Sequence, residues 1–104
     1  MKAWIAGVAG LLLVGCTTVQ FGRDFEIARF DSEVRIGTTD QSGVRALLGA
    51  PVSTGISMAG GERLVEWTYY YGDGKLSKLS EAKFKLLQIR FDSAGKVESF
   101  NWSE

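Results

Sequence analysis

The chain has 104 residues, with 12 basic and 12 acidic side chains, no histidine and one cysteine. This balance of interspersed charges argues against a nucleic-acid surface, which needs clustered basic residues. The lack of histidine removes the commonest general base and metal ligand at neutral pH, and one cysteine cannot form a disulfide within the chain. The composition therefore favours one small domain without catalytic residues, a metal or a cofactor.

The first part of the chain has the layout of a secretory signal. Lys2 precedes an apolar run over residues 3–14, and the small residue Gly15 leads to Cys16. A basic start, a short apolar segment and small residues before a cleavage site are typical of signal peptides. Such a run spans about 18 Å as a helix, well short of the ~30 Å hydrocarbon core of a membrane.

The tetrapeptide Leu13-Val14-Gly15-Cys16 resembles a bacterial lipobox. The resemblance implies signal cleavage between Gly15 and Cys16, a thioether lipid on Cys16, and acylation of the new amino terminus with a fatty acid such as palmitate. Two alternatives are an ordinary signal peptide with an incidental cysteine and an uncleaved apolar anchor. We expect a signal peptide at 1–15, a lipidated tether at 16–24 and a folded domain at 25–104.

Two helices are predicted at the start of the domain. Apolar residues recur near helical spacing over 25–35, which predicts the first helix. The second helix is expected to begin at Thr38 or Thr39, where a hydroxyl can cap exposed N–H groups. It is expected to end at Gly49, shortly before Pro51.

In the rest of the chain, apolar and polar residues alternate as they do in β-strands. The predicted strands cover 52–58, 63–71, 83–92 and 96–103, with a break at 72–74 and a loop or hairpin tip at 75–81. Trp67, Tyr69 and Tyr71 share one face of the second strand and are expected in the core. Phe84 and Leu86 are out of phase with their own strand, which predicts a bulge or a sheet covered on both sides.

The other sheet face is the best candidate for a binding surface. Five mixed residues are expected there: Glu66, Thr68, Tyr70, Gln88 and Arg90. Tyrosine and arginine are common at protein interfaces. The predicted partner surface therefore includes Tyr70 and Arg90, together with Lys75 and Lys78 of the adjoining loop.

Four segments in order resemble the SmpA/OmlA (BamE-like) small outer-membrane lipoproteins. These segments are Ile36-Gly37-Thr38-Thr39, 44–51, Glu66-Trp67-Thr68-Tyr69 and 89–97. The resemblance implies an α+β fold, in which two N-terminal helices pack on a three- or four-stranded antiparallel sheet, as in a half of the β-lactamase inhibitor protein. The chain departs from the family pattern by one extra residue between Thr39 and Val44.

The resemblance also implies a location and a role. Thr17, where an aspartate would favour inner-membrane retention, favours the outer membrane, and the domain would face the periplasm. The expected function is a lipid-anchored, non-catalytic accessory scaffold in outer-membrane protein assembly or envelope integrity. Its partners would be the membrane, through Cys16, and a protein of the assembly machinery. The alternative is a periplasmic inhibitor or binding module that acts on an enzyme.

Overall fold

The computed structural model describes residues 18–104, apart from the side chains of residues 76, 77 and 79. The expected signal peptide, its cleavage site and Cys16 lie outside the described residues. The elements in chain order are β1 (Thr18–Gly22), α2 (Ile27–Glu33), α3 (Gln41–Leu48), β2 (Ser53–Ala59), β3 (Glu62–Lys75), the 3-10 segment η2 (Leu76–Glu81), β4 (Lys83–Phe91) and β5 (Val97–Ser103).

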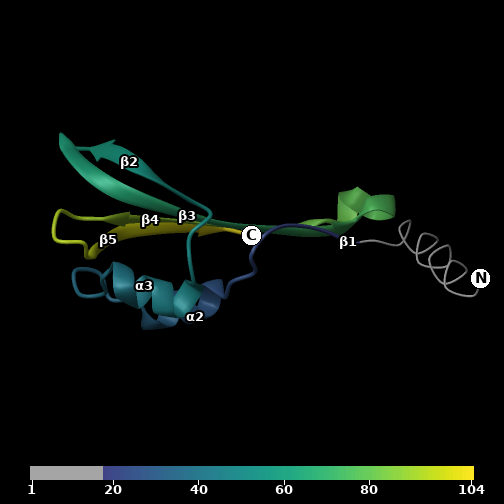
Figure 1. The fold of residues 1–104 in the computed structure, drawn as a ribbon, viewed down its shortest axis with the longest axis horizontal. Coiled ribbons are helices and arrows are strands. Elements are labelled where there is room, and N and C mark those ends of the chain that lie inside the picture. Colours follow the sequence, from purple (N-terminus) through teal and green to yellow (C-terminus); the bar gives the residue numbers. More distant parts are fainter. Residues whose placement is uncertain (1–17) are drawn as a thin grey trace, which may run out of the picture.

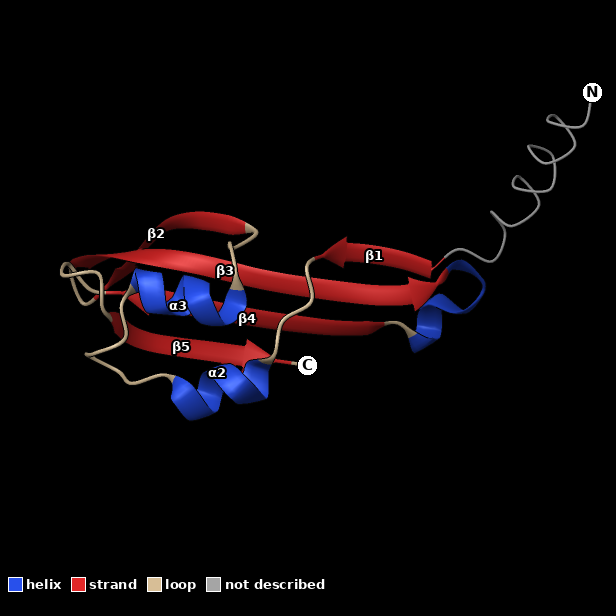
Figure 2. Ribbon diagram, turned by 60° about the horizontal axis from the view of Figure 1, so that its bottom comes forward, coloured by secondary structure: helices blue, strands red, loops and turns tan. Residues whose placement is uncertain are grey.

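All five strands form one antiparallel sheet. Its order is β1-β3-β4-β5, and β2 also pairs with β3. Strand β3 is long enough to carry two neighbours on one edge: β2 pairs with residues 62–68 and β1 with residues 71–75. Helices α2 and α3 cover one face of the sheet, and the other face carries no helix in the described chain (Figures 1 and 2). The expected α+β architecture is therefore confirmed.

The sheet has five strands, where we expected three or four. The additional strand is β1, which lies in the segment that we expected to be a tether. Thr18 pairs with Lys75, and Gly22 pairs with Tyr71. The segment carries only two apolar residues in strand phase, Val19 and Phe21, so its sequence hardly shows the pairing. The backbone of the long strand β3 forms the edge with which β1 pairs.

The expected break at Gly72-Asp73-Gly74 is wrong, because β3 continues to Lys75. These glycines make room for Phe84 on β4 and for Ala82 just before it. A Cβ atom at Gly72 would lie 2.8 Å from the Phe84 ring, and one at Gly74 would lie 2.8 Å from the Cβ of Ala82. The segment 75–81 is the tip of the β3–β4 hairpin, which was one of the two predicted possibilities, and most of it is coiled into η2.

Both predicted helices form, with different ends. Helix α2 is shorter than 25–35, since Val34 is already extended. Asp40 caps α3 by accepting a 2.9 Å hydrogen bond from the N–H of Gly43, a role that we assigned to Thr38 or Thr39. The hydroxyl of Thr39 instead accepts a hydrogen bond from the N–H of Arg35. Gly49 ends α3 as expected, with φ +82°.

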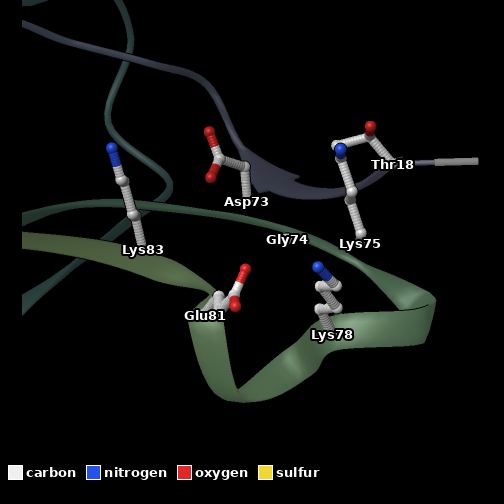
Figure 3. Close-up of a pocket in the computed structure, with 7 residues that line it drawn as sticks. All are labelled: Thr18, Asp73, Gly74, Lys75, Lys78, Glu81 and Lys83. Carbon is white, nitrogen blue, oxygen red and sulfur yellow. The ribbon is translucent and has the colours of Figure 1, made fainter.

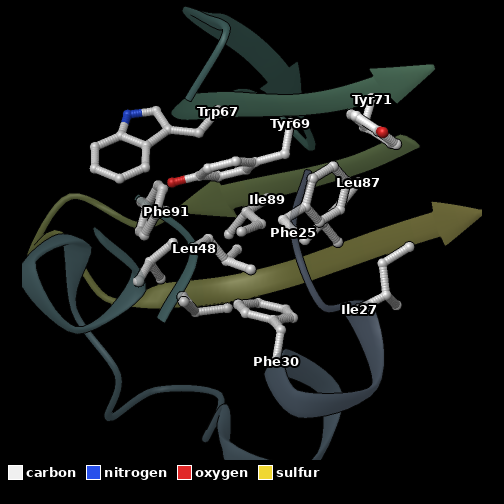
Figure 4. Packing of buried hydrophobic residues seen from close by; sticks show 12 residues of the cluster. Phe25, Ile27, Phe30, Leu48, Trp67, Tyr69, Tyr71, Leu87, Ile89 and Phe91 are labelled. Atoms are coloured by element: carbon white, nitrogen blue, oxygen red, sulfur yellow. The ribbon is translucent and has the colours of Figure 1, made fainter. Parts of the chain in front are cut away.

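The core lies between the helices and the sheet (Figure 4). Trp67, Tyr69 and Tyr71 are buried there, as predicted. The ring of Trp67 meets Phe91 edge-on at 4.8 Å between centroids, and Phe30 meets Phe100 at 5.0 Å. Edge-on aromatic pairs add ~0.5–1.5 kcal/mol beyond the burial of their surface. The other buried members of this cluster are Phe25, Ile27, Val44, Leu48, Leu87, Ile89 and Val97.

The bulge predicted near Phe84 and Leu86 is absent from the β3–β4 pairing, which runs in one register from Val65↔Phe91 to Asp73↔Lys83. The register shift lies instead between Arg90 and Phe91, where β4 meets β5. Phe84 is opposite Gly72 and therefore points to the sheet face away from the helices. Its side chain is about half exposed.

Candidate functional site

The open face of the sheet carries the residues expected there. Glu66 pairs across the strands with Arg90, Thr68 with Gln88, and Tyr70 with Leu86. Because side chains alternate along a strand, these residues point away from the helix-covered core. The sequence therefore placed the face correctly, and the structure shows how its members are grouped.

Arg90 is engaged within the sheet. Its Nε donates to the Glu66 carboxylate at 3.0 Å, and both side chains are partly shielded, with 36% and 22% exposed. A cross-strand pair of this kind contributes roughly 0.2–1 kcal/mol. The charges of Arg90 and Glu66 therefore compensate each other, and the two residues offer a partner a neutral pair.

Tyr70 belongs to a different group at the other end of the face. Its ring stacks on Phe84 with centroids 6.3 Å apart and planes at 29°. On the far side of Gly72, Phe21 of β1 is also exposed. We call Val19, Phe21, Tyr70, Ala82 and Phe84 the apolar patch. A shallow hollow of about 40 Å³ runs through it, lined by Val19, Phe21, Gly72, Asp73, Gly74, Ala82 and Phe84.

Sequence reasoning missed this patch, although a signal was present. Phe84 and Leu86 continue the alternation of Gln88 and Arg90 on the open face. The phase that we interpreted as a bulge or as cover on both sides of the sheet is therefore an apolar end to a polar face. Phe21 could not be assigned to the patch, because nothing in residues 18–22 indicated a strand.

Lys75 and Lys78 do come together, at the hairpin tip. They line a hollow of about 260 Å³ with Thr18, Asp73, Gly74, Glu81 and Lys83, shown in Figure 3. Among the described residues, no carboxylate lies within ion-pair distance of Lys75, Lys78 or Lys83. Arg90 is elsewhere: its partner Glu66 is roughly 30 Å from Lys75 along β3, at ~3.3 Å per residue. The four predicted residues therefore do not form one site.

A polar cluster on the helix side fixes the segment between β1 and α2. The Lys85 ammonium contacts the Asp24 carboxylate at 2.7 Å and the carbonyl of Phe25 at 2.9 Å. The hydrogen bond and the opposite charge lower the pKa of Asp24 and raise that of Lys85. Nearby, the Tyr71 hydroxyl donates to Asp73 at 2.9 Å, and this bond raises the pKa of Tyr71. No sequence pattern predicted the contacts of Lys85 with Asp24 and Phe25, which lie far from it in the chain.

Within residues 18–104, no three His, Cys, Asp or Glu side chains gather closely enough to hold a metal ion. All the fully buried side chains recorded there are hydrophobic or aromatic. In the same range, no helix is both long and apolar enough to cross a membrane. The described surface offers an apolar patch on the open face and, on the other face of the same hairpin tip, a hollow lined by three lysines and two carboxylates. Such an arrangement suits contact with another molecule.

Comparison of the chain with family models, characterised proteins and solved structures gives no match. Its function is therefore inferred from its own residues.

Proposed function

We propose that this protein is a lipid-anchored, non-catalytic protein of the bacterial outer membrane, with its domain in the periplasm. The observation that carries the proposal is Leu13-Val14-Gly15-Cys16 at the end of a short apolar run, in a chain whose only cysteine is Cys16. One acyl chain binds a membrane only marginally, whereas two or more give a stable anchor. The modification implied by the lipobox would supply them.

The beginning of the folded domain is consistent with such an anchor. Thr18, the first described residue, belongs to β1 and follows Cys16 by two positions in the sequence. A lipid on Cys16 would hold the end of β1 and the β3–β4 hairpin tip beside the bilayer, because Thr18 pairs with Lys75. The domain would then work at the membrane surface.

The accessory role in outer-membrane protein assembly or envelope integrity rests on the resemblance to SmpA/OmlA lipoproteins. Two helices on an antiparallel sheet agree with the architecture that this resemblance implies. The proposed surface for a protein partner is the open sheet face, where the mixed residues from Glu66 to Arg90 suit a hydrated contact of moderate size.

The test begins with the mass of the protein purified from envelopes. The proposal expects a chain that starts at Cys16 and carries acyl groups. Cys16→Ala should remove the lipid and change the membrane fraction in which the protein is found, while Thr17→Ala serves as a control that keeps the anchor. Wild-type protein with an unmodified Cys16 would contradict the proposal.

A pull-down of the lipidated protein from solubilised envelopes tests the role. Recovery of barrel-assembly components would support the scaffold, and recovery of one soluble enzyme would favour the alternative of an inhibitor. A Gln88→Ser variant, on the open face between Arg90 and Leu86 and outside the apolar patch, should weaken recovery of a partner that docks there. Asp31→Ser, on the exposed side of α2, is the matched control.

A further inference from the structure

The apolar patch is unusual because its large side chains have no cover in the described chain. Phe21 is 58% exposed and Phe84 is 51% exposed, and both are on the sheet face that carries no helix. The glycines between them, Gly72 and Gly74, keep the surface low enough for the rings to lie along it. An exposed aromatic group of this kind commonly marks a surface that another molecule covers.

The position of the patch in the chain points to the occupant. Val19 and Phe21 follow the apolar N-terminal segment directly, and Ala82 and Phe84 follow the hairpin tip that pairs with it. Any anchor at or before Cys16 therefore brings this end of the sheet to the bilayer first. The polar end of the open face, with Glu66 and Arg90, is the far end of the same strands.

Charged residues lie at the same hairpin tip, on its other face. Lys75 and Lys83 are in strand phase with Asp73, which accepts a hydrogen bond from the core residue Tyr71, whereas Phe21 and Phe84 are on the open face. Lys75, Lys78 and Lys83 line the hollow at the tip and outnumber its two described carboxylates, Asp73 and Glu81, with which they make no ion pair. Lysines next to a membrane are attracted to anionic headgroups, and aromatic rings favour the interface between headgroups and acyl chains. A membrane explains why aromatic rings, lysines and the anchor are all at one end of the sheet. A protein partner would not require the three features to lie together.

We infer that the apolar patch is a second membrane contact, which docks the β3–β4 hairpin tip into the interface of a bilayer containing anionic lipids. The inference rests on the proposed anchor at Cys16 and adds an orientation to it. The tip enters end-on: Phe21 and Phe84 enter the headgroup region on one face of it, and the three lysines contact the lipid phosphates from the other. The far end of the sheet, around Glu62 and Arg90, points away from the membrane and stays free for a protein.

The experiment uses the full chain, purified from envelopes and reconstituted into vesicles of phosphatidylethanolamine and phosphatidylglycerol that carry a nitroxide-labelled phospholipid. A fluorophore is attached to a cysteine introduced by Glu81→Cys, at the hairpin tip, or by Glu62→Cys, at the opposite end of β3. Both glutamates are exposed and lie outside the patch. We expect the lipid-borne nitroxide to quench the label at 81 strongly and the label at 62 weakly.

The label at 81 could be quenched simply because it is close to the anchor. Variants of the patch distinguish this effect from docking. Phe21→Ser with Phe84→Ser should lower the quenching at 81 towards the level seen at 62. Ile56→Ser with Met58→Ser removes two comparably exposed apolar side chains from β2 and should change nothing. Replacing Lys75, Lys78 and Lys83 by glutamine should lower the ratio of docked to undocked protein by about fivefold for each lysine at the surface.

Quenching at 81 that equals quenching at 62, or that survives the loss of Phe21 and Phe84, would overturn the inference. If the Glu81→Cys variant forms disulfide crosslinks between two chains before labelling, and the attached label is not quenched, the patch is a dimer contact and the inference fails.

Circular dichroism shows that each variant is folded. The mass of the same sample reports the lipid separately: an acylated chain without quenching refutes only the docking, and quenching without acylation refutes only the lipid anchor. A sample with a free Cys16 is labelled in a Cys16→Ser background.

Discussion

The hydroxyl of Tyr69, in the middle of β3, donates a hydrogen bond to the backbone carbonyl of Gly49 at 2.8 Å. Gly49 is the residue at which α3 ends, and its carbonyl has no partner within the helix. One side chain therefore fills the core with its ring and holds the end of a helix against the sheet with its hydroxyl. The ring also meets Phe25 at 5.8 Å between centroids, which connects it to the segment before α2.

This double role predicts the effect of Tyr69→Phe. The ring remains, but the Gly49 carbonyl loses its donor in a partly buried place. We expect the free energy of unfolding to fall by about 1–2 kcal/mol, measured by urea denaturation. Tyr70→Phe, on the open face of the same strand, is the matched control, because no hydrogen bond of its hydroxyl is recorded among the described residues. Equal losses in the two variants would contradict the role of the Gly49 contact.

The same tyrosine predicts how stability depends on alkaline pH. Burial raises the pKa of Tyr69 to about 12 from the usual 10.0, although Arg45 acts in the opposite direction. Between these values the folded chain keeps the proton that the unfolded chain releases, so stability falls as the pH rises through this window. Below the usual pKa the contribution is constant. The free energy of unfolding should therefore fall less for Tyr69→Phe than for the wild type between about pH 10 and about pH 12, in parallel urea titrations. A wild type and variant with identical alkaline slopes would exclude this effect.

The contact between Lys85 and Asp24 predicts a small effect at acid pH. The lowered pKa of Asp24 means that its contribution is present above the usual value of 3.8 and is lost as the pH falls through the pKa in the folded chain. The Asp24 side chain is 60% exposed, so solvent screening limits the contribution to less than about 1 kcal/mol. Asp24→Asn should be less stable than the wild type near neutral pH and equally stable near pH 2.

Asp31→Asn provides the control for that comparison. Asp31 is exposed on α2 and makes no ion pair recorded among the described residues. Its replacement should leave the free energy of unfolding unchanged at both pH values. A deficit of Asp24→Asn that persists at the lower pH would contradict its assignment to the ion pair with Lys85.

These contacts show what the sequence could predict and what it could not. Local patterns determine the burial of Trp67, Tyr69 and Tyr71, because alternation along one strand sets the face of each side chain. Polar residues of the open face, such as Arg90, follow from the same rule. The pairing of residues 18–22 with 71–75 depends on backbone hydrogen bonds between distant segments, which carry almost no signature in their side chains.

Glycine gave the most misleading signal. Gly72 and Gly74 were interpreted as a break because glycine is common in turns, and the structure places both inside a strand. Their small size matters there only because Phe84 and Ala82 lie opposite them. Which residues lie opposite is known only from the register in which β4 pairs with β3. The apolar patch could not be assembled from sequence for the same reason. Its members come from three strands whose alignment is a property of the fold.

Substitution of Gly74 by alanine tests this interpretation directly. Alanine in place of glycine within a strand normally stabilises by roughly 0.5–1 kcal/mol, because glycine loses more freedom on folding. At Gly74, however, the new Cβ would lie 2.8 Å from the Cβ of Ala82 and 3.2 Å from its Cα, which cannot swing aside. The strands must separate locally, and overpacking of this kind costs about 1–3 kcal/mol. Gly74→Ala should therefore destabilise the hairpin.

Gly55→Ala on β2 is the matched control for Gly74→Ala. A Cβ at Gly55 would meet nothing within 4 Å, and its backbone is not in the left-handed region. We expect this variant to be as stable as the wild type or slightly more stable, so the two substitutions should have opposite signs. Amide hydrogen exchange is the measurement, because it reports local opening: Gly74→Ala should speed exchange at residues 71–75 and 82–85 and leave the helix-covered part of β3 protected. Slower or unchanged exchange at the hairpin would mean that Gly74 does not relieve a clash with Ala82.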